Sequence, residues 1–251
     1  MASIIDAFRD SLHEELAGLK IVLYSIPVYL TVNLFLQGQT SQFQFWAIVV
    51  GFVLLGLLTQ GINNVRMNRK EILTLNPVLF VVALFKAMVV VVPKMLLYGF
   101  IGNLLVTKIH MPPEIPHLSL IYQIIVWSIV FSIIFTSYLS FAKHLYIQDG
   151  YNYKVIYDSC IDVLISLVLY LPQIVIANIV LIVPPAYLFF VFKLPFTHWG
   201  FVAICCMILI INISIIANYL AQSAYENIKG RDEDYNDNHE ITIVDTSKWK
   251  K

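Results

Sequence analysis

The chain has 251 residues, of which 59% are hydrophobic and 13% are charged, and its acidic and basic residues balance at 16 each. Soluble domains contain about 45–50% apolar and about 25% charged residues, so the composition excludes an ordinary soluble protein. The zero net charge gives no indication of nucleic-acid binding. The apolar residues fall in blocks of the roughly 20 residues that cross a bilayer core, which predicts an all-α, polytopic integral membrane protein.

Residues 1–20 combine apolar and charged positions at helical spacing. Ile5, Phe8 and Leu12 fall on one side of such a helix, and Asp10 falls on the other. The pattern predicts an N-terminal amphipathic helix that lies at the membrane surface, or equally an inner extension of the first span.

Six apolar segments follow, and they predict a bundle of about six transmembrane helices over residues 21–221. Their ranges are 21–36, 45–62, 78–106, 118–142, 161–192 and 199–221. The third and fifth segments are longer than a straight crossing needs. We expect the third to begin with a turn at the interface and to bend at Pro93. We expect the fifth to bend at Pro172 and to turn at Pro184 and Pro185 after it has crossed.

The basic residues predict the orientation, because cytoplasmic loops carry an excess of Lys and Arg. With the N-terminus inside, twelve Lys and Arg residues fall on the inner side, whereas Lys108 and Lys193 fall outside. We therefore expect both termini to be cytoplasmic, in a protein of a bacterial cytoplasmic membrane.

A weak internal repeat of about 79 residues lies beneath this layout. A shift of 79 superposes Pro93 on Pro172 and the segment 45–62 on the segment 118–142. Each unit would contain two crossings, which predicts a parallel repeat. Chance similarity between apolar segments is an equal alternative.

Four ionisable side chains in the third and fifth segments are candidate functional residues: Lys86, Lys94, Asp158 and Asp162. Such groups are costly in hydrocarbon and normally pair or line a water-filled cavity. We expect Lys86 to pair with Asp162, or alternatively to extend its amine to water at the inner interface. Lys94 lies deeper and follows Pro93, which frees a backbone carbonyl. Its amine could donate to such carbonyls, and a proton or ion pathway is the alternative.

Amide side chains within the spans form a second candidate set. Gln173 and Asn178 are in the fifth segment, and Asn212 and Asn218 are in the sixth. Hydrogen bonds between helices, worth about 0.6 kcal/mol each, are their expected role. A substrate site would require several of them to face one cavity.

The outer loop contains His110, Glu114 and His117, a weak candidate set for a divalent metal. No supporting motif accompanies them, and the chain has no P-loop, no GxSxG motif and no Gly-rich dinucleotide turn. We therefore expect no enzymatic activity, no cofactor and no metal.

Residues 222–251 form a charged cytoplasmic tail that the composition predicts to be largely disordered. Its last part, residues 231–251, contains a short apolar run and terminal lysines that could dock on a protein partner. These features favour a non-enzymatic membrane subunit of a larger transport or secretion assembly, with no nucleic-acid partner. The alternative is a stand-alone secondary transporter or channel that uses the intramembrane Lys and Asp residues. Such a protein would act as a homo-oligomer.

Overall fold

The computed structural model describes residues 9, 12–14, 16–67, 69, 72–73, 75–108, 117–221 and 228. In this part of the chain there are six long α-helices and one short 3-10 helix, and no strand. Their bounds are α2 (Ala17–Leu36), α3 (Thr40–Arg66), α4 (Pro77–Lys108), α5 (Leu118–Ala142), η1 (Ile147–Tyr151), α6 (Tyr153–Val191) and α7 (Trp199–Tyr219). All six α-helices are long and apolar enough to cross a membrane, which confirms the predicted all-α class with six spanning segments.

Two predicted regions fall largely outside the described residues. These are the N-terminal amphipathic helix over residues 1–20 and the charged tail over residues 222–251. Both stay predictions. The described part of the first region already enters α2 at Ala17, four residues before the predicted first span.

The helix α6 begins eight residues earlier than the predicted fifth segment. Lys154 and Asp158 lower the hydropathy of its first two turns, so the apolar pattern does not reveal them. Asn152 marks the beginning, because its side-chain oxygen accepts a hydrogen bond from the backbone N–H of Val155 at 3.4 Å. The helix then continues through all three of its prolines to Val191, so the turn expected at Pro184 and Pro185 does not end it.

The helix α4 is also continuous, from Pro77 to Lys108, so the turn expected at its start is absent. Asn76 caps this end, because its Oδ1 accepts hydrogen bonds from the backbone N–H groups of Val78 and Leu79 at 3.0 and 3.3 Å. Pro77 suits the first helical position, where a missing N–H costs nothing. The helix therefore begins at an Asn-Pro cap, where the sequence predicted a turn at the interface.

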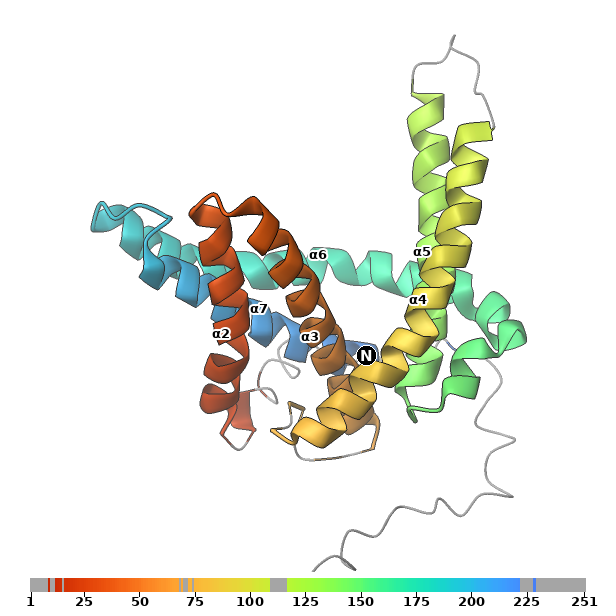
Figure 1. Cartoon of the computed structure of the whole chain (residues 1–251), viewed down its shortest axis with the longest axis horizontal. Helices are drawn as coiled ribbons and strands as arrows, with labels where there is room; N and C mark the ends of the chain where they lie inside the picture. The colour runs from red at the N-terminus through yellow and green to blue at the C-terminus, as the bar shows by residue number, and fades with distance from the viewer. Residues whose placement is uncertain are drawn as a thin grey trace, which may run out of the picture.

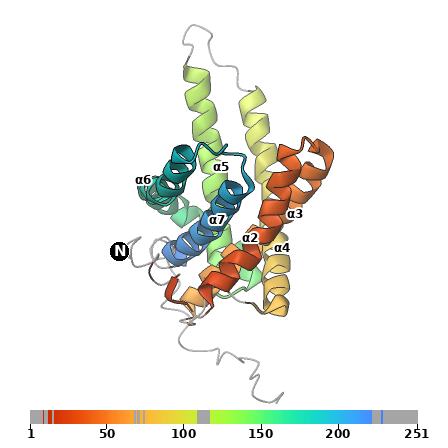
Figure 2. The same cartoon turned by 90° about the vertical axis from the view of Figure 1, so that its left-hand side faces the viewer.

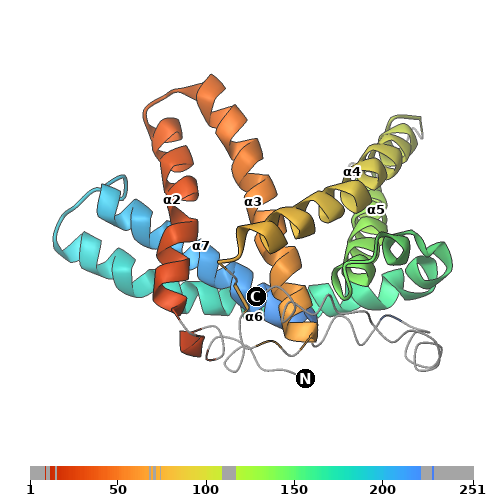
Figure 3. The same cartoon turned by 60° about the horizontal axis from the view of Figure 1, so that its bottom comes forward.

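The helices form three hairpins, α2–α3, α4–α5 and α6–α7, which share one base and whose tips point in different directions (Figures 1 and 3). Viewed from the side, the tip of the α4–α5 hairpin rises above α6 and α7, while α5 contacts α6 nearer the base (Figure 2). The helix α3 is central, because it contacts α2, α4, α5 and α7. The base contains the α5–α6 connection, at residues 143–152, and the described residues between α3 and α4.

The tightly packed core lies at the base. Leu139, Phe141 and Ala142 at the end of α5 are fully buried, as is Ala217 near the end of α7. A Cβ added to Gly61 of α3 would lie 2.7 Å from the Cβ of Ala217, so only glycine permits this close crossing of α3 and α7. The parts of the hairpins away from the base instead expose apolar side chains, as expected where spanning helices meet lipid. Examples are Phe45, Leu96, Phe100, Ile124 and Phe190.

Candidate functional site

Most of the buried polar side chains gather at the base of the three hairpins rather than along the spans. Two of them are ammonium groups, on Lys20 and Lys94, each only 2% exposed. Burying a charge is costly unless hydrogen bonds compensate it, so both lysines identify places where the chain supplies partners. The remaining buried polar residues at this end include Thr59, Asn63, Asn64, Ser137, Ser140 and Asp149.

The Lys94 ammonium is held between α4, α5 and the connection that follows α5. Its Nζ donates hydrogen bonds to Ser137 Oγ and to the backbone carbonyl of Gly150. The same nitrogen lies 4.6 Å from the ring centroid of Tyr151 and 5.4 Å from that of Tyr153. Two oxygen dipoles and two aromatic faces therefore compensate the charge without a carboxylate.

The partners of Lys94 reach it because the chain reverses after α5. Leu145 adopts a left-handed conformation with φ 57°, and η1 then folds back along the helix end. Ser137 Oγ donates to the Gly150 carbonyl at 2.6 Å, and Ser140 Oγ donates to the Asp149 carbonyl at 3.0 Å. The end of α5 thus fixes the turn whose carbonyl receives Lys94.

Gly150 is required by close packing. A Cβ added there would lie 2.6 Å from Val90 Cγ1 and 3.2 Å from Phe141 Cβ. Real Cβ atoms do not approach so closely, so a side chain at this position would push η1 away from α4 and α5. The glycine therefore sets the depth at which its carbonyl meets the lysine.

Pro93 contributes to the same site through the backbone group that it leaves free. Proline has no N–H, so the carbonyl of Val89 loses its usual helical donor. The hydroxyl of Tyr151 donates to that carbonyl at 2.8 Å. The sequence suggested that the lysine amine donates to a carbonyl freed by proline. In the structure, the Tyr151 hydroxyl donates to the Val89 carbonyl instead, and Lys94 donates to the Gly150 carbonyl in the α5–α6 connection.

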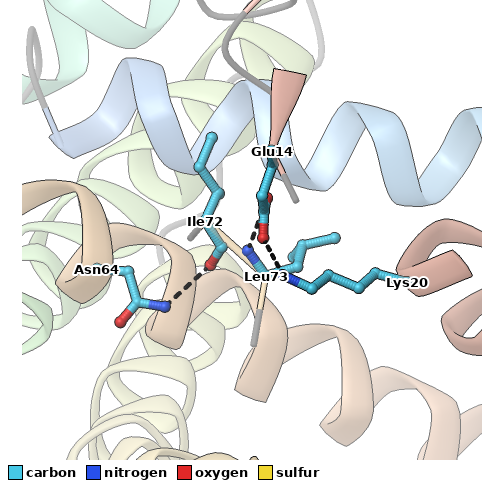
Figure 4. A network of polar contacts seen from close by, with 5 residues as sticks. All are labelled: Glu14, Lys20, Asn64, Ile72 and Leu73. Carbon is cyan, nitrogen blue, oxygen red and sulfur yellow. Dashed lines mark hydrogen bonds and ion pairs between the residues drawn. The ribbon is translucent and has the colours of Figure 1, made fainter. Parts of the chain in front are cut away.

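The second buried ammonium, on Lys20, forms a 2.5 Å ion pair with Glu14 (Figure 4). Glu14 Oε2 also accepts from the backbone N–H of Leu73 at 3.3 Å, and Asn64 Nδ2 donates to the Ile72 carbonyl at 3.1 Å. These bonds fasten the start of α2 to the α3–α4 connection. From the sequence, Lys20 is expected only to be one of the twelve basic residues on the inner side.

That pair was missed because its spacing is not helical. Glu14 and Lys20 are six residues apart, whereas side chains meet on one helix at three or four. Leu16 lies between them in a left-handed conformation, φ 58°, which turns the chain so that the carboxylate folds back. No periodic pattern signals such a turn.

The last turns of α3 satisfy backbone carbonyls at the ends of neighbouring helices. Asn63 Nδ2 donates to the carbonyl of Lys143 at 2.6 Å, and Arg66 donates to that of Ala221 at 3.0 Å. The final carbonyls of a helix lack internal donors and carry a partial negative charge. The polar side chains of α3 therefore act as caps for α5 and α7.

The other predicted ionisable residues are not brought to Lys94. Lys86 on α4 and Asp162 on α6 are half-buried, and Asp158 is exposed. The pairing of Lys86 with Asp162 stays a prediction.

The amide side chains differ in their surroundings. Asn178 of α6 and Asn212 of α7 exchange two hydrogen bonds of 2.7 and 3.2 Å between the two helices. Asn218 is buried near the end of α7, whereas Gln173 is exposed on α6. These amides do not converge on one location.

The weak metal candidate is only partly described. His110 and Glu114 lie outside the described residues, and His117 immediately precedes α5. Among the described residues, no group of three His, Cys, Asp or Glu side chains could hold a metal ion.

The contacts at the base hold the Lys20 and Lys94 ammonium groups in fixed positions. They also join the start of α2 to the α3–α4 connection, and α4 to the α5–α6 connection. Every contact that we describe for Lys94 comes from the chain itself. No protein-family model matches the sequence, and neither a curated protein nor a solved structure matches it.

Proposed function

We propose that the protein is a non-enzymatic, membrane-embedded subunit of a larger transport- or secretion-type assembly. The observation that carries the proposal is the enclosure of Lys94, which is 2% exposed and donates to Ser137 and Gly150. A charge that carries ions or substrate has to meet water during its cycle. A charge enclosed by the chain's own oxygens instead stabilises a scaffold.

The distribution of the other polar groups supports the same function over a stand-alone transporter. Lys86, Asp158 and Asp162 lie in surroundings different from that of Lys94, and Asn178 is occupied by Asn212. A transport path would require several of these groups to face one wet cavity. The proposed subunit needs them only to fix helices relative to one another.

The proposal includes an orientation. We place both termini and the base of the hairpins on the cytoplasmic side of a bacterial cytoplasmic membrane, following the excess of basic residues there. The chain direction would change at Pro93, Pro172 and the Pro184–Pro185 pair, each of which removes a helical hydrogen bond. The three hairpin tips then lie toward the outside.

The docking segment of the proposed subunit is the tail, residues 231–251. Its apolar run and terminal lysines suit the addition of a strand to a cytoplasmic partner. We place the partner on this side because the tail follows α7, whose end packs in the base.

Co-purification tests the proposal. The tagged full chain and a chain truncated after Gly230 are isolated from native membranes in mild detergent, and the associated proteins are quantified by mass spectrometry. We expect a stoichiometric partner that is lost on truncation. Recovery of the protein alone, or only as a homo-oligomer, from both preparations would overturn the docking role. Proton-coupled flux through the reconstituted protein, abolished by Lys94→Met, would favour the transporter.

A further inference from the structure

The middle of α6 carries polar groups at a depth where lipid offers no partner. The helix has 39 residues, and Pro172 is its central residue. At about 1.5 Å per residue its length is roughly 58 Å, far more than the roughly 30 Å of the hydrocarbon core. Whichever end projects further, the residues around Pro172 lie within that core.

Two polar groups occur at this point. Pro172 has no N–H, so the carbonyl of Val168 loses its usual donor four residues later. Gln173 follows with an exposed amide that has two donor hydrogens and an acceptor oxygen. In the part of the chain that is described, no side-chain hydrogen bond reaches either group. An unsatisfied polar group in hydrocarbon costs several kcal/mol, so a partner is required.

The equivalent position on α4 shows how the chain satisfies such groups when it can. Pro93 frees the carbonyl of Val89, and Tyr151 donates to that carbonyl from inside the same molecule. Among the described residues no side chain donates to the Val168 carbonyl, and Val168 is 57% exposed. In this part of the chain, Pro172 therefore lacks the internal compensation that Pro93 has.

The surface around Gln173 has the composition of a helix–helix contact. Leu169, Ile176 and Val180 lie four residues before, three after and seven after Gln173, which places all of them on one face. Their side chains are 63%, 62% and 64% exposed. We call these four residues the α6 stripe. Lipid tails could cover its apolar members, but they cannot satisfy the amide at its centre.

We propose that the α6 stripe packs against the same stripe of a second copy of this chain around a two-fold axis. A two-fold contact places like residues opposite one another, and a glutamine amide both donates and accepts. Two Gln173 side chains can therefore satisfy each other. The chain already uses such a reciprocal amide pair between Asn178 and Asn212, at 2.7 and 3.2 Å. This inference goes beyond the proposed function, because it concerns two copies and not a different protein.

Disulfide cross-linking in native membranes tests the contact. Cys160, Cys205 and Cys206 are first replaced by alanine in the full-length chain. Leu169→Cys and Ile176→Cys are then introduced separately, which leaves Gln173 in place. The matched control is Leu96→Cys on α4, which is 70% exposed and outside the stripe.

We expect oxidation to give a covalent dimer from both stripe variants and not from the control. Adding Gln173→Leu should reduce the dimer yield about threefold to tenfold, as expected for one or two lost amide hydrogen bonds in a membrane. Gln173 is exposed, so this variant keeps the fold of the single chain. Equal cross-linking at Leu96 and in the stripe would overturn the proposal, and so would an adduct with a different protein. Loss of the tail-dependent partner would leave this result unchanged, so the two proposals fail separately.

Discussion

A proline followed by a polar residue occurs well inside two helices, as Pro93–Lys94 in α4 and Pro172–Gln173 in α6. The predicted 79-residue shift superposes these two pairs. In α4 the lysine is 2% exposed and the freed carbonyl accepts from Tyr151, whereas in α6 the glutamine is exposed. The same pair of a proline and a polar residue is therefore buried in α4 and exposed in α6.

The difference lies in whether a described turn folds back against the helix. The α5–α6 connection folds back as η1 and brings Gly150 and Tyr151 against α4. The α6–α7 connection lies at the far end of α6, at residues 192–198, and does not return to Pro172. The buried site on α4 thus depends on a returning turn, and no such turn reaches Pro172 in the described part of the chain.

Removal of the Lys94 side chain should have the largest effect on the α4 site. Lys94→Ala deletes two charge-assisted hydrogen bonds and leaves a cavity where the buried stem packed. We expect the free energy of unfolding to fall by about 3 kcal/mol. Unfolding in mixed micelles of mild detergent and dodecyl sulfate measures it. Lys86→Ala on the same helix is the control, and we expect a loss below about 1 kcal/mol there because that side chain is only half-buried.

A methyl group at the turn should separate η1 from α4. Gly150→Ala places a Cβ 2.6 Å from Val90, so we expect a loss of about 2 kcal/mol from overpacking. Gly99→Ala is the matched control, because no atom lies within 4 Å of its added Cβ. That control should be neutral or stabilising by about 0.5–1 kcal/mol, as for glycine in a helix interior. Equal unfolding curves for both variants would contradict the tight packing of η1.

The freed carbonyl beneath Pro93 gives a smaller effect. Tyr151→Phe removes the hydroxyl that donates to Val89 but keeps the ring near Lys94. We expect a loss of about 1 kcal/mol, the net value of one hydrogen bond. Tyr187→Phe serves as control, because that residue is 64% exposed on α6. Thermal unfolding followed by circular dichroism compares the two variants.

The amide pair between α6 and α7 should contribute least. Asn178→Leu removes a reciprocal pair, and we expect about 0.6 kcal/mol, in line with other interhelical hydrogen bonds in membranes. A double-mutant cycle with Asn212→Leu isolates the coupling. Strictly additive single effects would show that the two amides do not interact.

The sequence predicted the helices better than the site. Long apolar segments located all six helices, but several polar helix ends were missed: the start of α6 with Lys154 and Asp158, the start of α2, and both ends of α3. Lys94 was recognised as costly, but its partners were not, because Gly150 lies 56 residues away in a turn with no apolar periodicity. The ion pair of Glu14 with Lys20 was invisible for a similar reason, since a left-handed residue sets its geometry.

Amine labelling of the folded protein in native membranes tests the central claim most directly, namely that Lys94 is enclosed and does not line a wet path. A small water-soluble acylating reagent is applied, and each lysine is quantified by mass spectrometry against protein labelled after unfolding in dodecyl sulfate. Lys193, exposed after α6, reports full accessibility. We predict that Lys193 is labelled and that Lys94 stays unmodified until the protein unfolds. Labelling of Lys94 in the folded protein at a rate close to that of Lys193 would contradict the scaffold and favour a transport pathway.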